Sequence, residues 1–70
     1  MTFISGDRFW CLTIEPPGKT RQMVFGIVYS YLHSRDAYSV IWDTSTPKHW
    51  IEWSNNKMYE TSMHKCCYTL

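Results

Sequence analysis

Three cysteines and three histidines are the side chains of this sequence best suited to bind a metal ion or to act as nucleophiles. Cys66 and Cys67 are adjacent and follow His64 closely, whereas Cys11 lies far away in the sequence. A structural zinc site needs four ligands, and its paired cysteines are usually separated by about two residues. Neither Cys11 nor the remaining histidines have the spacing to complete such a site, so we expect no metal ion and no other cofactor. The odd number of cysteines and their positions do not fit the disulfide framework of a secreted protein, so we expect reduced thiols.

Nucleophilic catalysis needs a nucleophile, a base and an orienting group in a pocket that excludes water. The sequence contains no glycine-rich nucleophile turn, no phosphate-binding loop and no metal-ligand motif. A domain of 70 residues is also small for a substrate pocket, which typically measures roughly 300 Å³ or more. We therefore expect a protein that is not an enzyme.

Aromatic residues make up 17% of the chain and include four Trp and five Tyr. Most of these rings are expected to form the core of a small domain, because each can bury roughly 150–250 Å². One small interior cannot hold all of them, however, and exposed Trp and Tyr are typical anchors of protein interfaces. The residues predicted to bind a partner protein are aromatic anchors with arginines at the rim that orient the encounter: Tyr29, Tyr31, Trp42, Trp50, Trp53, Arg21 and Arg35.

The formal net charge is +1, with seven basic and six acidic residues spread along the chain. This balance argues against a strong electrostatic attraction to nucleic acid or to an anionic membrane. Single-stranded nucleic acid stays an alternative partner, because Lys19, Arg21 and Lys48 have aromatic neighbours that could stack on bases. No stretch of about 18 apolar residues could span a membrane, and the first residues lack a signal-peptide core, so a cytoplasmic protein is expected.

We expect these residues to lie mainly on β-strands, because β-branched and aromatic residues dominate the segments that contain them. The first predicted strand covers residues 8–14 and ends at Pro16, Pro17 and Gly18. The second and longest covers residues 22–33, with Met23, Phe25, Ile27, Tyr29 and Tyr31 on one face. Its other face is also largely apolar, so the strand is covered on both sides, curls over a core or shows one face to a partner. Gly26 in its middle marks a bend or a bulge.

The remaining segments are shorter. Residues 37–43 alternate as a third strand, and residues 49–53 form a fourth, with Trp50 and Trp53 on opposite faces. Residues 57–59 are expected to form one helical turn, and residues 59–63 a fifth strand. The whole chain, 1–70, is one domain, with a barrel over residues 6–62 and a frayed or docked tail over residues 63–70.

Two short patterns resemble the SH3-like barrels of Tudor and mind-bomb-type domains. These commonly carry a Gly-x-Val followed by a Val-x-Trp-Asp pattern, matched here by residues 26–28 and 40–43. The resemblance covers roughly residues 6–62, although residues 44–47 replace the usual glycine-rich turn. It implies an all-β fold, either a small five-stranded SH3-like barrel or a strongly curled antiparallel sheet, with one short helical turn near the C-terminus.

The function expected from these features is that of a small, non-catalytic protein-binding module. Its size is typical of a viral, phage or accessory modulator of a larger host complex. Two alternatives stay open: a nucleic-acid-binding barrel, and an obligate homodimeric subunit that buries the second apolar face of residues 22–33 between copies.

Overall fold

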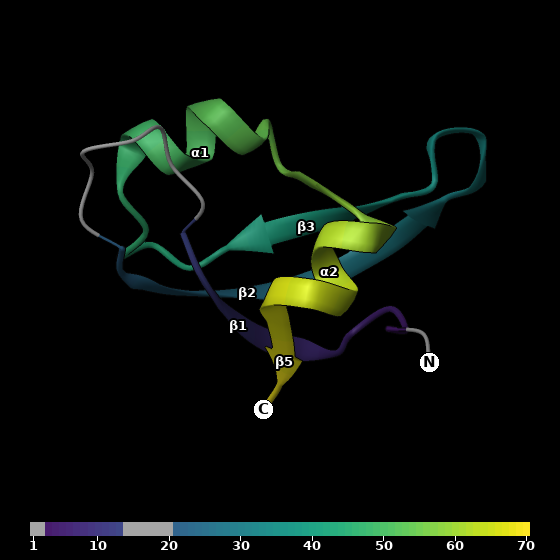
Figure 1. The fold of residues 1–70 in the computed structure, drawn as a ribbon, viewed down its shortest axis with the longest axis horizontal. Helices are drawn as coiled ribbons and strands as arrows, with labels where there is room; N and C mark the ends of the chain where they lie inside the picture. The colour runs from purple at the N-terminus through teal and green to yellow at the C-terminus, as the bar shows by residue number, and fades with distance from the viewer. Residues whose placement is uncertain (1–2, 14–20) are drawn as a thin grey trace.

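The computed structural model describes residues 3–13 and 21–70, which form one antiparallel sheet with two short helices (Figure 1). The strands follow the order β4-β3-β2-β1-β5 across the sheet. Their bounds are β1 Arg8–Leu12, β2 Met23–Leu32, β3 Ala37–Trp42, β4 Lys57–Tyr59 and β5 Cys67–Thr69. A 3-10 turn, η1 His33–Arg35, joins β2 to β3, and the helices are α1 Lys48–Ser54 and α2 Glu60–Cys66.

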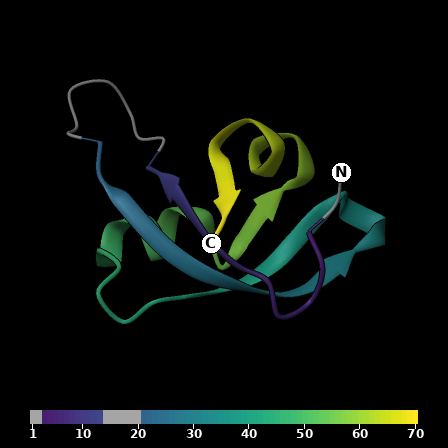
Figure 2. The ribbon, with the colours of Figure 1, turned by 90° about the horizontal axis from the view of Figure 1, so that it is seen from below.

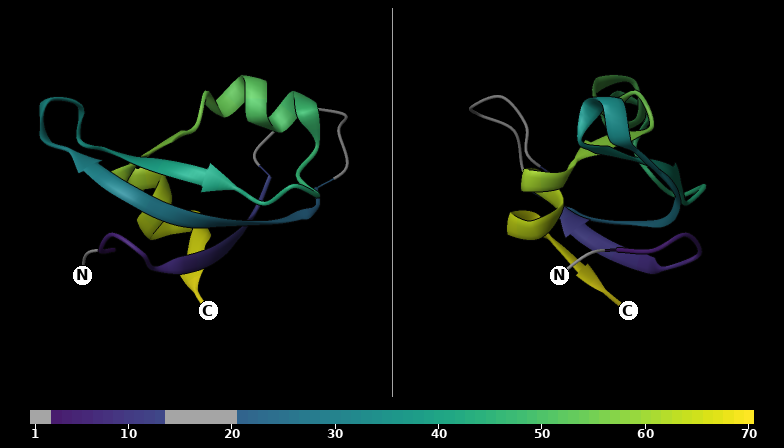
Figure 3. Two further views of the ribbon diagram at one scale, coloured as in Figure 1. Left: turned by 180° about the vertical axis from the view of Figure 1, so that it is seen from behind. Right: turned by 90° about the vertical axis from the view of Figure 1, so that its right-hand side faces the viewer.

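The sheet is strongly curled and encloses the core as a half-barrel (Figures 2 and 3). Every strand pairing is antiparallel, which confirms the predicted five-stranded, curled antiparallel sheet. Both helices lie on its concave side, where Trp50 of α1 and Met63 of α2 join the buried cluster. The sheet therefore has an inner face that packs against the helices and an outer face that they leave uncovered.

The inner face is built by alternate residues of the three central strands. Phe9 and Cys11 of β1 and Val24 and Val28 of β2 are buried there. Gly26 lies between them, and a Cβ atom at this position would be 2.9 Å from Cζ of Phe9. The glycine is therefore required by the close approach of a core ring. The predicted bulge is present but lies further along β2, between Val28 and Ser30.

Residues 48–54 form a helix, so the strand predicted over 49–53 is wrong. The prediction rested on the β-propensity of Trp and Ile, whereas residues three apart share a face of a helix. Trp50 and Trp53 accordingly stack, with ring centroids 5.0 Å apart, instead of pointing to opposite faces. The helix ends where Asn55 adopts a left-handed conformation with φ of 55°, which asparagine tolerates.

The last third of the chain also differs from the sequence-based prediction. Residues 57–59 form β4 instead of a helical turn, and the short helix near the C-terminus is α2, in the place of the predicted fifth strand. Residues 67–69 form β5, which pairs with β1. The segment 63–70 is thus no appendage to a barrel of residues 6–62, because it supplies half of a helix and an edge strand.

No helix in the described ranges, 3–13 and 21–70, is long and apolar enough to cross a membrane. The proline-rich end of the first predicted strand and Lys19 lie outside these ranges.

Candidate functional site

The outer face of the sheet carries a continuous set of apolar side chains, here called the outer apolar face. Its members alternate with core residues along β1, β2 and β3, so that the pleat of each strand turns them away from the interior. All are exposed except Trp10, which is half-buried. The outer apolar face consists of Trp10, Leu12, Met23, Phe25, Ile27, Ile41 and Tyr68.

Strand register joins these residues into rows that run across the sheet. In one row, Tyr68 of β5 is paired with Trp10 of β1, which is paired with Phe25 of β2. The Trp10 and Tyr68 ring centroids are 4.7 Å apart. In the next row, Ile27 of β2 is paired with Ile41 of β3, which is 54% exposed. Directly opposed residues on one face of a sheet are in contact range, so the rows form one surface.

Charged groups of both signs border this surface. Arg8 is paired with Ile27 on the outer side of β1, and it lines a hollow together with Phe25, Ile41 and Asp43. The hydroxyl and the backbone N–H of Ser45 both donate to Asp43, which lowers the pKa of this carboxyl. Arg8 lowers it further, although less. At this part of the rim, the outer apolar face is therefore bordered by an anion, Asp43, and a cation, Arg8.

The predicted anchors do not share one surface. Trp42 and Trp50 are core residues, and Trp50 has no exposed surface at all. Trp42 is fixed by a hydrogen bond of 2.9 Å from its Nε1 to Oγ of Ser54. Trp50 therefore offers no surface to a partner, and Trp42 offers only the small part that lines the hollow with Arg8 and Ile41, so neither ring is a large exposed anchor. Trp53 is 57% exposed, but it lies on α1, on the side of the molecule opposite the outer apolar face.

The two tyrosines of β2 are separated by the bulge. Tyr29 is the unpaired residue at the bulge and is 63% exposed. Beyond the bulge the alternation is reversed, and Tyr31 packs against the core and against the Tyr38 ring, 5.0 Å away. The remaining predicted site residues, Arg21 and Arg35, are exposed before β2 and in η1, and they lie apart from each other.

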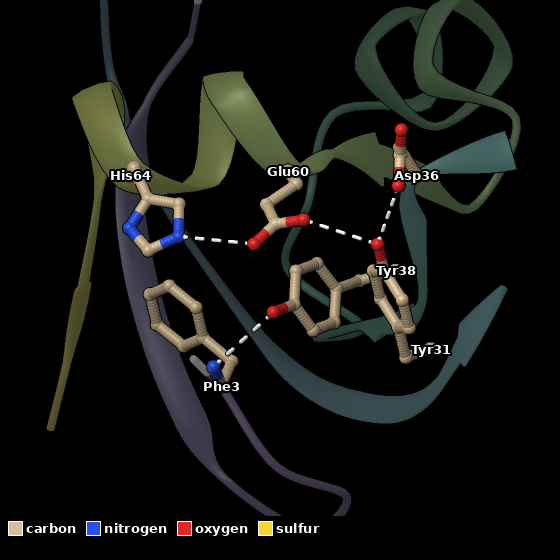
Figure 4. A network of polar contacts seen from close by, with 6 residues as sticks. All are labelled: Phe3, Tyr31, Asp36, Tyr38, Glu60 and His64. Atoms are coloured by element: carbon tan, nitrogen blue, oxygen red, sulfur yellow. Dashed lines mark hydrogen bonds and ion pairs between the residues drawn. The ribbon is translucent and has the colours of Figure 1, made fainter. Parts of the chain in front are cut away.

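A polar cluster at the hairpin end of the sheet involves Tyr31 (Figure 4). Its hydroxyl lies 2.7 Å from Oδ1 of Asp36 and 3.0 Å from Oε1 of Glu60. The other carboxylate oxygen of Glu60 lies 3.4 Å from Nε2 of His64. The two carboxylates raise the pKa of the Tyr31 phenol, because each favours its protonated form. The cluster ties the β2–β3 hairpin to α2.

Within residues 3–13 and 21–70, no group of three or more His, Cys, Asp and Glu is arranged to hold a metal ion.

Sequence reasoning missed Trp10, Ile41 and Tyr68 as parts of a surface, although it placed Phe25 and Ile27 on one face of a strand that could show a face to a partner. The signal was the apolar character of both faces of residues 22–33. The strand order could not be read from it, and only that order brings β5 beside β1.

No protein-family model matches the sequence. A comparison with curated proteins finds no match. A comparison with solved structures likewise finds none.

Proposed function

We propose that this protein is a non-catalytic binding module whose outer apolar face docks onto a partner protein. The observation that carries this proposal is the extent of the face, which continues over β5, β1, β2 and β3 with no covering element among the described residues. Large exposed apolar patches bordered by polar groups are typical of interaction sites, because their burial removes apolar surface from water.

The anchors are held in place before a partner arrives. Trp10 belongs to the middle of three adjacent strands, and the Tyr68 ring packs against it. Rings fixed by strand pairing lose little conformational freedom on binding, so more of the free energy of burial becomes affinity. Arg8 and Asp43 at the rim then select a partner with complementary charges.

The shape of the surface favours a larger partner over a second copy of this chain. The outer apolar face lies on the convex side of the curled sheet (Figure 3). Two convex faces bury little area against each other, whereas a stable interface buries about 800 Å² on each partner. The proposed partner therefore has a concave apolar groove, and the protein acts by occupying it. We further propose that the protein is an accessory or viral modulator of a cytoplasmic complex. The same proposal includes a relationship to SH3-like barrels.

Crosslinking and substitution test this proposal together. A photo-crosslinking amino acid at position 41 is expected to capture one protein from the native lysate, and the same amino acid at position 59 is expected not to capture it. With the purified partner, Phe25→Thr and Ile41→Thr should each weaken binding about 30-fold, as expected for an anchor worth about 2 kcal/mol.

Tyr59→Thr is the matched control, because Tyr59 is also an exposed strand residue but is not part of the outer apolar face: it lies on β4, paired with Ala37 at the opposite end of β3 from Ile41. It should change Kd less than about twofold. Equal affinity of the Phe25 and Ile41 variants and the wild type would contradict the proposal. A stable homodimer at micromolar concentration that Ile41→Thr disrupts would also contradict the proposal, because the outer apolar face would then bind a second copy of this chain.

The row Tyr68–Trp10–Phe25 also supports single-stranded nucleic acid as a second candidate. Exposed rings stack on bases, and Arg21 and Lys65 border the hollow beside Tyr68. A labelled oligothymidine at low salt provides the test. Binding that quenches tryptophan fluorescence and weakens steeply with salt would support this candidate, whereas no binding at low salt would exclude it.

A further inference from the structure

Two of the three thiols lie directly opposite each other across a pair of strands. Cys11 of β1 is paired in register with Cys67 of β5. Both side chains point to the inner face, where Cys11 is 0% and Cys67 is 5% exposed. The two thiols are close enough for each to shift the pKa of the other. The proposed binding face does not use either thiol.

The hydrogen-bond pattern identifies the type of this pair. The Leu70 N–H donates to the Arg8 carbonyl over 2.9 Å, so the Phe9–Thr69 pair between these groups is a non-hydrogen-bonded pair. Because the two types alternate along an antiparallel ladder, Cys11 and Cys67 also form a non-hydrogen-bonded pair. The Cα atoms of such pairs are about 4.5 Å apart, which is near the short end of the range of about 4.4–6.8 Å for disulfides.

We propose that Cys11 and Cys67 are a reversible thiol–disulfide site, oxidised by exchange with a small disulfide such as oxidised glutathione. The register already provides the required Cα separation without a backbone shift. The exchange is reversible, because a small thiolate can attack the protein disulfide in the opposite direction.

The exchange can begin at β5, because a three-residue edge strand opens more readily than the centre of the sheet. In the open state the Cys67 thiolate attacks the small disulfide, which forms a mixed disulfide and releases one small thiolate. When β5 pairs again with β1, the Cys11 thiolate attacks Sγ of Cys67 and expels the second small thiolate. Two protein thiols are thereby oxidised to one disulfide, one small disulfide is reduced to two thiols, and both protons pass to the small thiols.

Access assigns the order of the two attacks. Cys67 belongs to the edge strand β5, so it meets the small disulfide first when β5 opens. In the reduced protein the neighbouring Cys67 thiol lowers the pKa of Cys11, whereas Cys11 and burial raise the pKa of Cys67. The mixed disulfide has no Cys67 S–H, so the final attack depends on the register that places Cys11 opposite Cys67.

The test uses the full, reduced chain in buffers with a graded ratio of oxidised to reduced glutathione, followed by alkylation and mass spectrometry. The wild type should change from three alkylated cysteines to one, Cys66, with loss of two hydrogens per chain. Dithiothreitol should restore all three. The oxidised form should unfold at a higher temperature, by about 10 °C, because the bond closes a long loop.

Trypsin cleavage after Lys65 leaves Cys66 and Cys67 in one peptide, so peptide mapping alone does not distinguish which of them forms the disulfide. Cysteine variants are therefore used to assign the bond. The Cys66→Ser variant should still form the intramolecular bond and lose both alkylation sites, whereas Cys11→Ser should stop at the mixed disulfide. If Cys11→Ser does not fold, the number of alkylated cysteines in the wild type and in Cys66→Ser still tests the proposed disulfide. A bond between Cys66 and Cys67, disulfides between chains or no oxidation in either protein would each overturn the proposal.

Discussion

Tyr29 and Tyr31 show how strongly one extra residue changes the environment of a side chain. Both belong to the same face of an ideal strand, yet Tyr29 is exposed and Tyr31 packs on the core. The cause is the bulge between Val28 and Ser30, which reverses the alternation beyond it. Tyr31 thereby reaches the two carboxylates at the hairpin, where its hydroxyl performs a structural role instead of anchoring a partner.

Replacing Tyr31 by Phe tests this role through the pH dependence of stability. The raised pKa means that the folded state retains the phenol proton more firmly than the unfolded chain, whose pKa is about 10. The stabilisation is therefore fully present below about pH 10 and is lost as the pH rises above it. Wild type and Tyr31→Phe should differ most in urea midpoint below about pH 9, and this difference should shrink above about pH 10.

Parallel urea titrations from pH 7 to pH 11 measure this difference, and Tyr29→Phe is the control. Tyr29 is the exposed tyrosine at the bulge, and its variant should follow the wild type throughout. A Tyr31→Phe variant whose stability deficit is constant with pH would contradict the assignment of the proton to Tyr31.

At the scale of elements, the central strands could be predicted from sequence and the ends of the sheet could not. Period-two alternation locates β2 and β3 because each has one buried face over several residues. The edge strands β4 and β5 contain three residues each, too few to show a period. Similarly, α1 is a seven-residue helix rich in residues that prefer strands, and its packing against Trp42 overrides that preference. Tyr68 was missed as part of the candidate face for the same reason, since it lies on β5.

The two tryptophans of α1 differ sharply in exposure, and this difference gives a direct test of the helix packing. Trp50 contacts both Trp42 and Trp53, with ring centroids 5.7 Å and 5.0 Å away, and it is completely buried. Trp50→Ala should lower the free energy of unfolding by about 3–5 kcal/mol, because it leaves a large cavity. Trp53→Ala should cost about 1 kcal/mol, since only its stacked face is covered. Urea unfolding followed by circular dichroism provides both values, and equal costs would contradict the helical arrangement.

At the scale of the whole molecule, a small domain keeps a large apolar surface in water while carrying almost no net charge. The formal charge is +1, so electrostatic repulsion between copies is weak near neutral pH. We expect the curled sheet to limit the resulting self-association, because two convex outer faces can touch over only a small area. The same shape that we propose for docking into a groove is thus expected to disfavour a stable dimer.

This balance predicts weak self-association that depends on both charge and the outer apolar face. At pH near the isoelectric point of about 7.7, concentrated wild-type protein should show net attraction in light scattering, while sedimentation at micromolar concentration finds a monomer. Ile41→Lys should abolish the attraction, because it replaces an exposed apolar side chain of the face by a charge. Tyr59→Lys adds the same charge elsewhere and should reduce the attraction only as far as the change in net charge does. If the two lysine variants behave alike, net charge alone controls the association, and the outer apolar face is not the surface through which copies meet.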